Sequence, residues 1–219
     1  RDLMMRAAPR SDWSKQAFPW LSVRRCFIAN AECVAMSVSF SGELAYELHV
    51  PNEQLKLAYD TLIAAGCDFG LKPFGLRATE SMRIEKGYRH WKADLITEYN
   101  PFESALDRFV DLGKEFVGKD ALLKRRIAGK RRCFVSAEIN SSITPAHPGD
   151  SFLSEGEVVG TVTSAAWGYR TGKNLAMGFV DPEVSAIGSK LELDLLGDVV
   201  SARICEPCPY DPGNSRVKG

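Results

Sequence analysis

Glycines recur at short intervals through the C-terminal part of the sequence. They separate runs rich in β-branched and aliphatic residues, such as V-V-G-T-V-T-S, L-A-M-G-F-V and K-L-E-L-D-L-L. The separating glycines are Gly149, Gly156, Gly160, Gly168, Gly172, Gly178, Gly188 and Gly197. Turn residues about every 8 to 12 positions between strand-like runs are typical of a small antiparallel sandwich or barrel. Residues from about Phe134 to Pro209 are therefore predicted to form an antiparallel β-barrel domain.

The sequence before this region begins with strand patterns. Residues 34–40 alternate apolar with small side chains, and residues 45–50 resume a strand pattern after Ser41-Gly42. Alternation with a period of two indicates a β-strand that is buried on one side. Two strands that meet at a glycine turn are the simplest interpretation.

Three helices are predicted between the strands and the glycine-rich region. Residues 51–66 place apolar side chains near one helical face and end on a glycine, and residues 73–87 do so less regularly. Glycine is common at the C-terminal end of a helix, and proline at its start. The third helix is expected to begin at Gly118 or Asp120, in a stretch rich in lysine and arginine.

These patterns together predict an α+β protein with two small domains. A chain of 219 residues has room for one large domain or two small ones. The change in composition near the third helix places the boundary there. Residues 1–115 are predicted to form an α+β domain, which is partial, and residues 116–219 a domain built on the barrel.

Composition excludes two classes of partner. The 28 basic residues balance the 28 acidic ones, so no overall positive field favours nucleic acid. The apolar runs are shorter than the roughly 18 residues that a membrane span needs, so no membrane partner is expected.

Six cysteines without a preceding secretory signal predict a cytoplasmic location. Because the first residue is an arginine, we expect a fragment of something longer.

Several common functional motifs are absent or incomplete. Cys205 and Cys208 form a C-x-x-C pair, but zinc needs four ligands and no second pair completes the set. The pair follows a strand pattern, not the helix start that a redox pair uses, which favours two ordinary thiols. The three histidines are dispersed, and no G-x-S-x-G, Walker or G-x-G-x-x-G motif is present. No metal site is predicted, and the catalytic residues are unknown.

Glu47 is the most informative single residue in the strand patterns. It lies between Tyr46 and Leu48, so alternation places it on the opposite face, together with Ala45 and His49. A carboxylate that faces inward is costly unless it is paired or receives hydrogen bonds from a ligand. The alternative is that Glu47 faces water or pairs with a nearby arginine.

Two further clusters combine charged and aromatic residues. Residues 81–91, S-M-R-I-E-K-G-Y-R-H-W, have the dense charge that is usual at a solvated helix end. Residues 100–110, N-P-F-E-S-A-L-D-R-F-V, look by themselves like the start of a helix.

Taken in order, these segments resemble the aminomethyltransferase family, which includes the glycine-cleavage T-protein. The matching motifs are S-G-E-L-A-Y-E-L, G-L-R-A-T-E-S-M-R-I-E-K-G-Y-R-H-W, N-P-F-E-S-A-L-D-R-F-V, F-V-G-K-D-A-L, V-V-G-T-V-T-S-A-A-W-G-Y with G-K-N-L-A-M-G-F-V, and P-Y-D-P-G-N-S-R. The resemblance covers nearly everything from Phe18 onward. It is greatest to the folate-binding C-terminal part of dimethylglycine and sarcosine dehydrogenases.

The resemblance implies tetrahydrofolate-dependent transfer of a methylene or methyl unit, with folate and a small amine or methyl donor as partners. Carried over from the family, Glu47 is the anchor of the pterin ring and Tyr46 and Leu48 flank it. Phe40 stands where the family usually has tyrosine, and Arg108 replaces a family aromatic residue. These five residues are the candidate cofactor-binding residues.

The family also implies parts that this sequence does not contain. Its functional aspartate belongs to an N-terminal half, so the chain alone is expected to be inactive and to line half a site. FAD is expected only in a possible upstream domain, not in this chain. The segment before Phe18 is predicted to be loosely held, and the missing half or a second copy of the chain to cover it. A non-catalytic module that binds a small ligand or docks a partner is the alternative.

Overall fold

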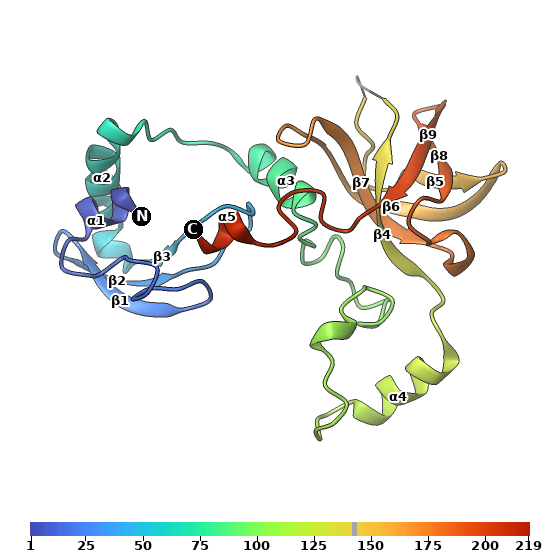
Figure 1. Cartoon of the computed structure of the whole chain (residues 1–219), viewed down its shortest axis with the longest axis horizontal. Helices are drawn as coiled ribbons and strands as arrows, with labels where there is room; N and C mark the ends of the chain where they lie inside the picture. The colour runs from blue at the N-terminus through green and yellow to red at the C-terminus, as the bar shows by residue number, and fades with distance from the viewer. Residues whose placement is uncertain (142–143) are drawn as a thin grey trace. The chain divides into compact units, whose positions relative to one another are not determined.

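The computed structural model describes residues 1–141 and 144–219. The chain forms two compact units. Unit 1 comprises residues 1–79 together with residues 211–219, and unit 2 comprises residues 80–210 (Figure 1). Helices and strands are both present, which confirms the predicted α+β class. The predicted domains, residues 1–115 and 116–219, stay a prediction.

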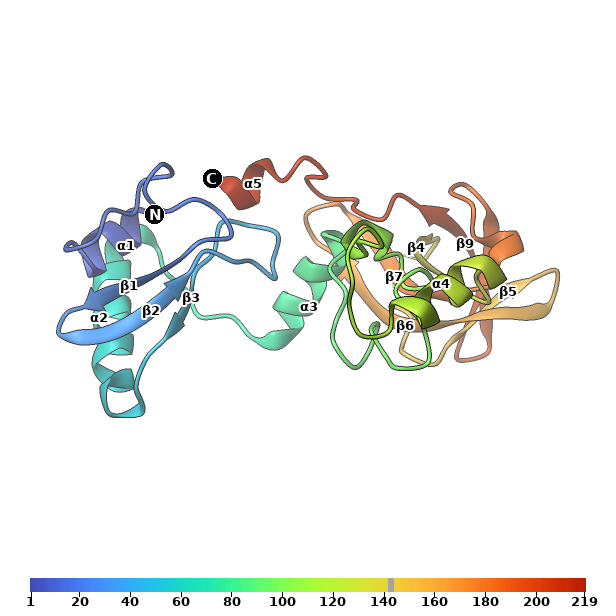
Figure 2. The ribbon, with the colours of Figure 1, turned by 90° about the horizontal axis from the view of Figure 1, so that it is seen from below.

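Unit 1 is a three-stranded antiparallel sheet with helices packed on it. The strands occur in the order β1-β2-β3, and α2 lies alongside the sheet (Figure 2). The strands are β1 (Val23–Ile28), β2 (Ala31–Met36) and β3 (Glu47–His49), and the helices are α1 (Asp2–Ala7), α2 (Leu55–Gly66) and α5 (Ser215–Lys218). The helix predicted for residues 51–66 is confirmed, with a 3-10 turn at Asn52–Gln54 as its first part.

The strand prediction for residues 34–50 is right in pairing and wrong in extent. β2 and β3 do pair antiparallel, but β2 ends at Met36 and ten residues link it to β3. Residues 37 to 46 therefore form a loop in place of a tight turn at Ser41-Gly42. The alternation up to residue 36 follows burial, because Ala31, Cys33 and Ala35 enter the core of unit 1.

The segment before Phe18 is packed firmly, so the prediction that it is loosely held is wrong. The Trp13 side chain is completely buried, and its Nε1 donates to the Ala8 carbonyl oxygen at 3.0 Å. Its ring meets the Phe18 ring edge-on at 5.3 Å. Burial of an aromatic side chain of this size is among the largest single contributions that a small core receives.

Unit 2 is built on a closed antiparallel barrel of six strands, which confirms the barrel prediction. The strands follow one another around the barrel in the order β4-β7-β6-β5-β8-β9. They are β4 (Cys133–Ile139), β5 (Ser151–Ser154), β6 (Glu157–Gly168), β7 (Lys173–Val180), β8 (Lys190–Leu195) and β9 (Asp198–Cys205). Phe152, Ala176 and Leu193 are fully buried members of its apolar core.

Two further helices precede the barrel strands in sequence. They are α3 (Leu76–Glu85) and α4 (Lys119–Ala128). Both were predicted, and α4 begins directly after Gly118, whose φ of 93° suits glycine. No helix in residues 1–141 or 144–219 is long and apolar enough to span a bilayer.

Glycine at position 178 permits close contact between β6 and β7. A Cβ atom built there would overlap the Thr161 carbonyl oxygen and lie 3.0 Å from the Phe152 ring. Backbone atoms of a paired strand cannot move aside without loss of the ladder between the strands. The glycine spacing read from the sequence thus includes positions where side chains do not fit.

We therefore expect Gly178→Ala to lower the free energy of unfolding by about 1 to 3 kcal/mol, because the barrel becomes overpacked. Gly213→Ala is the control, since a Cβ there meets no atom within 4 Å. Urea unfolding followed by circular dichroism measures both variants. Equal stability of the two would contradict the argument.

Candidate functional site

Strand β3 divides its side chains between the core and an outward face. Tyr46 precedes the strand and packs with Leu48 against the core of unit 1, whereas Glu47 and His49 point away from it. The Glu47 side chain is 60% exposed. Alternation correctly placed Glu47 on the face opposite Tyr46 and Leu48, and of the two interpretations left open for its carboxylate, the one in which it faces water describes the structure. Outward placement avoids the cost of desolvating an unpaired charge.

The register of the sheet places apolar side chains beside these two polar ones. Glu47 is paired with Met36, and His49 with Val34. Val34 and Met36 are half-buried, and Val23, the partner of Met36 on β1, is exposed. Paired residues of neighbouring strands share a face of the sheet. Glu47 and His49 thus stand at the border of a small apolar surface on the outward face of unit 1.

The distance between the Glu47 Oε2 and His49 Nε2 atoms is 3.9 Å. That is too long for a direct hydrogen bond. Among the residues that the structure describes, His49 is the only ion-pair contact of Glu47. The carboxylate oxygens therefore keep lone pairs for hydrogen-bond donors from outside the unit.

Tyr46 holds the strand that carries Glu47. Its ring stacks on Phe18 at 5.5 Å and meets Trp13 edge-on at 5.2 Å. The hydroxyl group is buried and has no hydrogen-bond partner in the described part of the chain. Burial raises the pKa of this phenol above its usual value, so it stays neutral.

The remaining two candidate residues lie outside β3. Phe40 is in the loop between β2 and β3 in unit 1, with 37% of the residue exposed. Arg108 is in unit 2, in a 3-10 turn at Asp107–Phe109, and its guanidinium lies over the Phe109 ring at 4.7 Å. Roles of all five residues toward folate stay predictions.

The first part of the charged cluster, residues 81–86, is largely buried, which corrects the expectation of a solvated helix end; His90 and Trp91 at its end are exposed. Arg83 is 2% exposed and Asp94 is fully buried. The Arg83 guanidinium donates to Asp94 at 2.7 Å and to the Ser164 hydroxyl at 2.6 Å. The Asp94 carboxylate also accepts from the His90 backbone N–H at 2.7 Å. This ion pair joins the region of α3 to strand β6 of the barrel.

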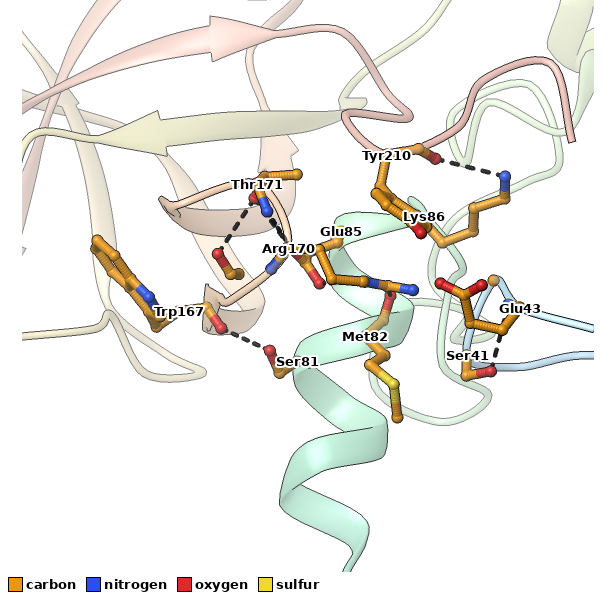
Figure 3. Close-up of polar contacts among 12 residues, drawn as sticks. Ser41, Glu43, Ser81, Met82, Glu85, Lys86, Trp167, Arg170, Thr171 and Tyr210 are labelled. Carbon is orange, nitrogen blue, oxygen red and sulfur yellow. Dashed lines mark hydrogen bonds and ion pairs between the residues drawn. The ribbon is translucent and has the colours of Figure 1, made fainter. Parts of the chain in front are cut away.

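A second buried carboxylate, Glu85, fixes the turn between β6 and β7 (Figure 3). It accepts hydrogen bonds from the Arg170 backbone N–H at 2.8 Å, from Arg170 Nε at 2.7 Å and from the Thr171 backbone N–H at 2.7 Å. The Ser81 hydroxyl donates to the Trp167 carbonyl oxygen at 2.6 Å. A Cβ atom at Gly168 would lie 2.7 Å from Glu85 Cγ, so the turn and the helix are in close contact.

The cluster at residues 100–110 does not start an α-helix, contrary to its sequence interpretation. Asn100 and Glu103 exchange the hydrogen bonds of a capping box. The chain then turns away at Ala105, whose φ is 52°. Glu103 is buried and accepts from Arg131 Nε at 2.9 Å, so it joins this turn to the segment before β4.

Glu103 gives the stability of unit 2 a predictable dependence on pH. Burial opposes ionisation, but hydrogen bonds from the Arg131 side chain and from the Asn100 and Arg131 backbone hold the pKa of Glu103 at about 2. A carboxyl whose pKa is lower in the folded state stabilises the fold above its unfolded pKa. This contribution is lost as the pH falls from about 4.5 to 2.

We expect Glu103→Gln to destabilise the protein by about 2 kcal/mol at pH 7, the scale of a hydrogen bond to a charged group. The loss relative to wild type should shrink as the pH falls from 4.5 toward 2. Urea unfolding at several pH values measures the difference. A loss that stays constant down to pH 2 would mean that the charge of Glu103 does not stabilise the fold.

Neither the thiols nor the acidic residues form a metal centre in the described part of the chain. There, no group of three or more His, Cys, Asp or Glu side chains could hold a metal ion. The Cys208 Sγ–H donates to the Tyr210 carbonyl oxygen at 3.1 Å, and burial raises the pKa of the Cys205 thiol to about 11. A thiol with so high a pKa is a poor nucleophile at neutral pH.

Comparison with known proteins agrees with this architecture. Residues 1–114 match the family model of the GCVT N-terminal domain, and residues 130–211 match that of the glycine cleavage T-protein C-terminal barrel domain. The chain therefore belongs to the glycine-cleavage T-protein family, which confirms the resemblance read from its motifs.

Individual relatives include two mitochondrial dehydrogenases of Mus musculus. Sarcosine dehydrogenase is 34% identical over 218 residues, and dimethylglycine dehydrogenase 32% over 211 residues. These matches cover 95% and 94% of this chain and 24% of each relative. The chain thus spans about a quarter of their length.

A solved structure shares the fold. The glycine cleavage system aminomethyltransferase T from Bartonella henselae superposes with a TM-score of 0.75 at 22% identity. The match covers 82% of this chain and 50% of that one.

Proposed function

We propose that this chain carries the pterin-anchoring part of an enzyme that transfers a one-carbon unit to or from tetrahydrofolate. Family membership and the outward carboxylate of Glu47 support the proposal. Tetrahydrofolate, when bound, supplies the nitrogen that accepts the methylene or methyl unit. The contribution of the chain is to hold and orient the ring, not to attack it covalently.

The proposal rests mainly on the exposed carboxylate of Glu47. The pterin ring presents a 2-amino group and an N3–H side by side, and a carboxylate accepts two parallel hydrogen bonds from such a pair. The Glu47 oxygens have no hydrogen bond in the described part of the chain and are exposed to receive them. The packed strand fixes the backbone position of Glu47 before the ligand arrives.

The surface beside Glu47 suits a flat ring. Val34 and Met36 present half-buried apolar side chains on the same face of the sheet. A pterin that lies on them has its polar edge directed at β3 and its face on apolar atoms. Pockets for small ligands commonly combine apolar walls with a few polar groups that fix orientation.

The donor of the one-carbon unit, a small amine or a methyl donor, is proposed to bind where other parts of the protein complete the site. A further N-terminal half, or a second copy of the chain, would supply them. We also propose a cytoplasmic location, in keeping with the free thiols of Cys26, Cys33, Cys67, Cys133 and Cys205.

We expect Glu47→Gln to weaken tetrahydrofolate binding by about 10-fold to 100-fold. The amide replaces one acceptor by an NH2 group, so one charge-assisted hydrogen bond is lost and a donor faces a donor. Calorimetric titration of tetrahydrofolate into the protein at its full encoded length measures this.

Glu32→Gln is the matched control for this experiment. Glu32 is on β2, 53% exposed, and its carboxylate lies 3.4 Å from Arg25. The Glu32→Gln variant should bind tetrahydrofolate with the affinity of the wild type. Equal affinities of Glu47→Gln and wild type would instead favour a non-catalytic module in which Glu47 is merely solvated.

A further inference from the structure

His49 is the second polar side chain on the outward face of β3. It is 62% exposed, and its Nε2 atom lies 3.9 Å from Glu47 Oε2. Both residues extend from one short strand, two positions apart, beside Val34 and Met36. The two polar atoms are close enough to contact neighbouring atoms of one ligand edge and too far apart to satisfy each other.

The two side chains offer complementary chemistry. An ionised carboxylate only accepts hydrogen bonds, whereas an imidazole can donate one. The Nε2 atom is the ring nitrogen of His49 that lies near the Glu47 carboxylate. Glu47 and His49 therefore present an acceptor and a donor side by side.

We propose that His49 reads the 4-oxo group of the pterin and so determines specificity for 4-oxo pterins. The ring edge carries the 2-amino group, N3–H and the 4-oxo oxygen in that order. Glu47 accepts from the first two, and His49 Nε2–H donates to the third. This assignment rests on the proposed function, because it requires that the ring binds at Glu47.

Other residues on this face do not offer the same hydrogen bond. Val34 and Met36 are apolar, and the Arg25 guanidinium, across the sheet from His49, lies 3.4 Å from Glu32. Within the described outward face of β2 and β3, His49 is the donor next to Glu47. A site built to satisfy a specific polar atom rejects an analogue that lacks it more strongly than an apolar pocket does.

The test compares tetrahydrofolate with tetrahydroaminopterin, which has a 4-amino group in place of the 4-oxo group and no hydrogen on N3. Calorimetry on the protein at its full encoded length gives the affinities of wild type, His49→Leu, His49→Gln and Glu47→Gln. We expect His49→Leu to weaken tetrahydrofolate about tenfold and the 4-amino ligand less than about threefold. The amide of His49→Gln can donate, so it should retain tetrahydrofolate affinity within about threefold.

Two results would overturn the assignment of His49. If His49→Leu weakens both ligands equally, His49 acts on the site as a whole and not on the 4-oxo group. If His49→Leu changes the affinity for neither ligand, His49 is a solvated neighbour of Glu47.

The Glu47→Gln arm separates this failure from failure of the proposed function. Only tetrahydrofolate carries both the 2-amino group and N3–H, so the variant should weaken tetrahydrofolate. If it does so while His49→Leu leaves the preference between the ligands unchanged, only the His49 assignment fails. If Glu47→Gln binds tetrahydrofolate like wild type, the ring does not bind at Glu47 and both proposals fail.

Discussion

Packing of Tyr46 against Phe18 and Trp13 determines what β3 presents to solvent. Side chains of a strand alternate between its faces, so a slip of one residue would exchange Tyr46 and Leu48 for Glu47 and His49. The stacked and edge-on ring contacts at 5.5 and 5.2 Å make that slip costly. The N-terminal segment takes part because it supplies Trp13, which is why it is ordered. Core packing in unit 1 thus sets the chemistry of the outward face.

In unit 2, buried charged side chains hold segments of the chain together. Asp94, Glu85 and Glu103 are each buried and each receive hydrogen bonds from an arginine side chain and from backbone N–H groups. Asp94 and Glu85 join α3 to the barrel, and Glu103 joins the turn at residues 100–106 to the segment before β4. Removal of one partner from such a pair leaves an uncompensated charge, so these contacts specify which segments meet. These three carboxylates therefore have a structural role.

The sequence was most informative where local patterns and burial agree. The barrel could be predicted from glycines such as Gly178, and the helices from their capping residues. Both signals are local, because they depend on neighbouring residues in the sequence. The extent of β2 was misjudged, since Val38 and Phe40 continue the alternation without continuing the pairing. Burial of Arg83 could not be read from residues 81–91, because its partner Asp94 is a lone acid in a loop and Ser164 is 81 positions away. The outward orientation of Glu47 could not be predicted locally, because it depends on which face of β3 packs on Trp13, a residue distant in sequence.

We propose that a pterin ring lies on the outward face of unit 1, beside Glu47. The chain has five methionines, and Met36 is the one paired with Glu47. Methyl NMR of protein labelled at methionine can therefore follow tetrahydrofolate binding to the full-length protein. A ring bound on this face should cause a ring-current shift of the Met36 methyl resonance and no shift of the buried Met4 and Met177. Saturable binding that shifts another methionine and leaves Met36 unchanged would contradict it.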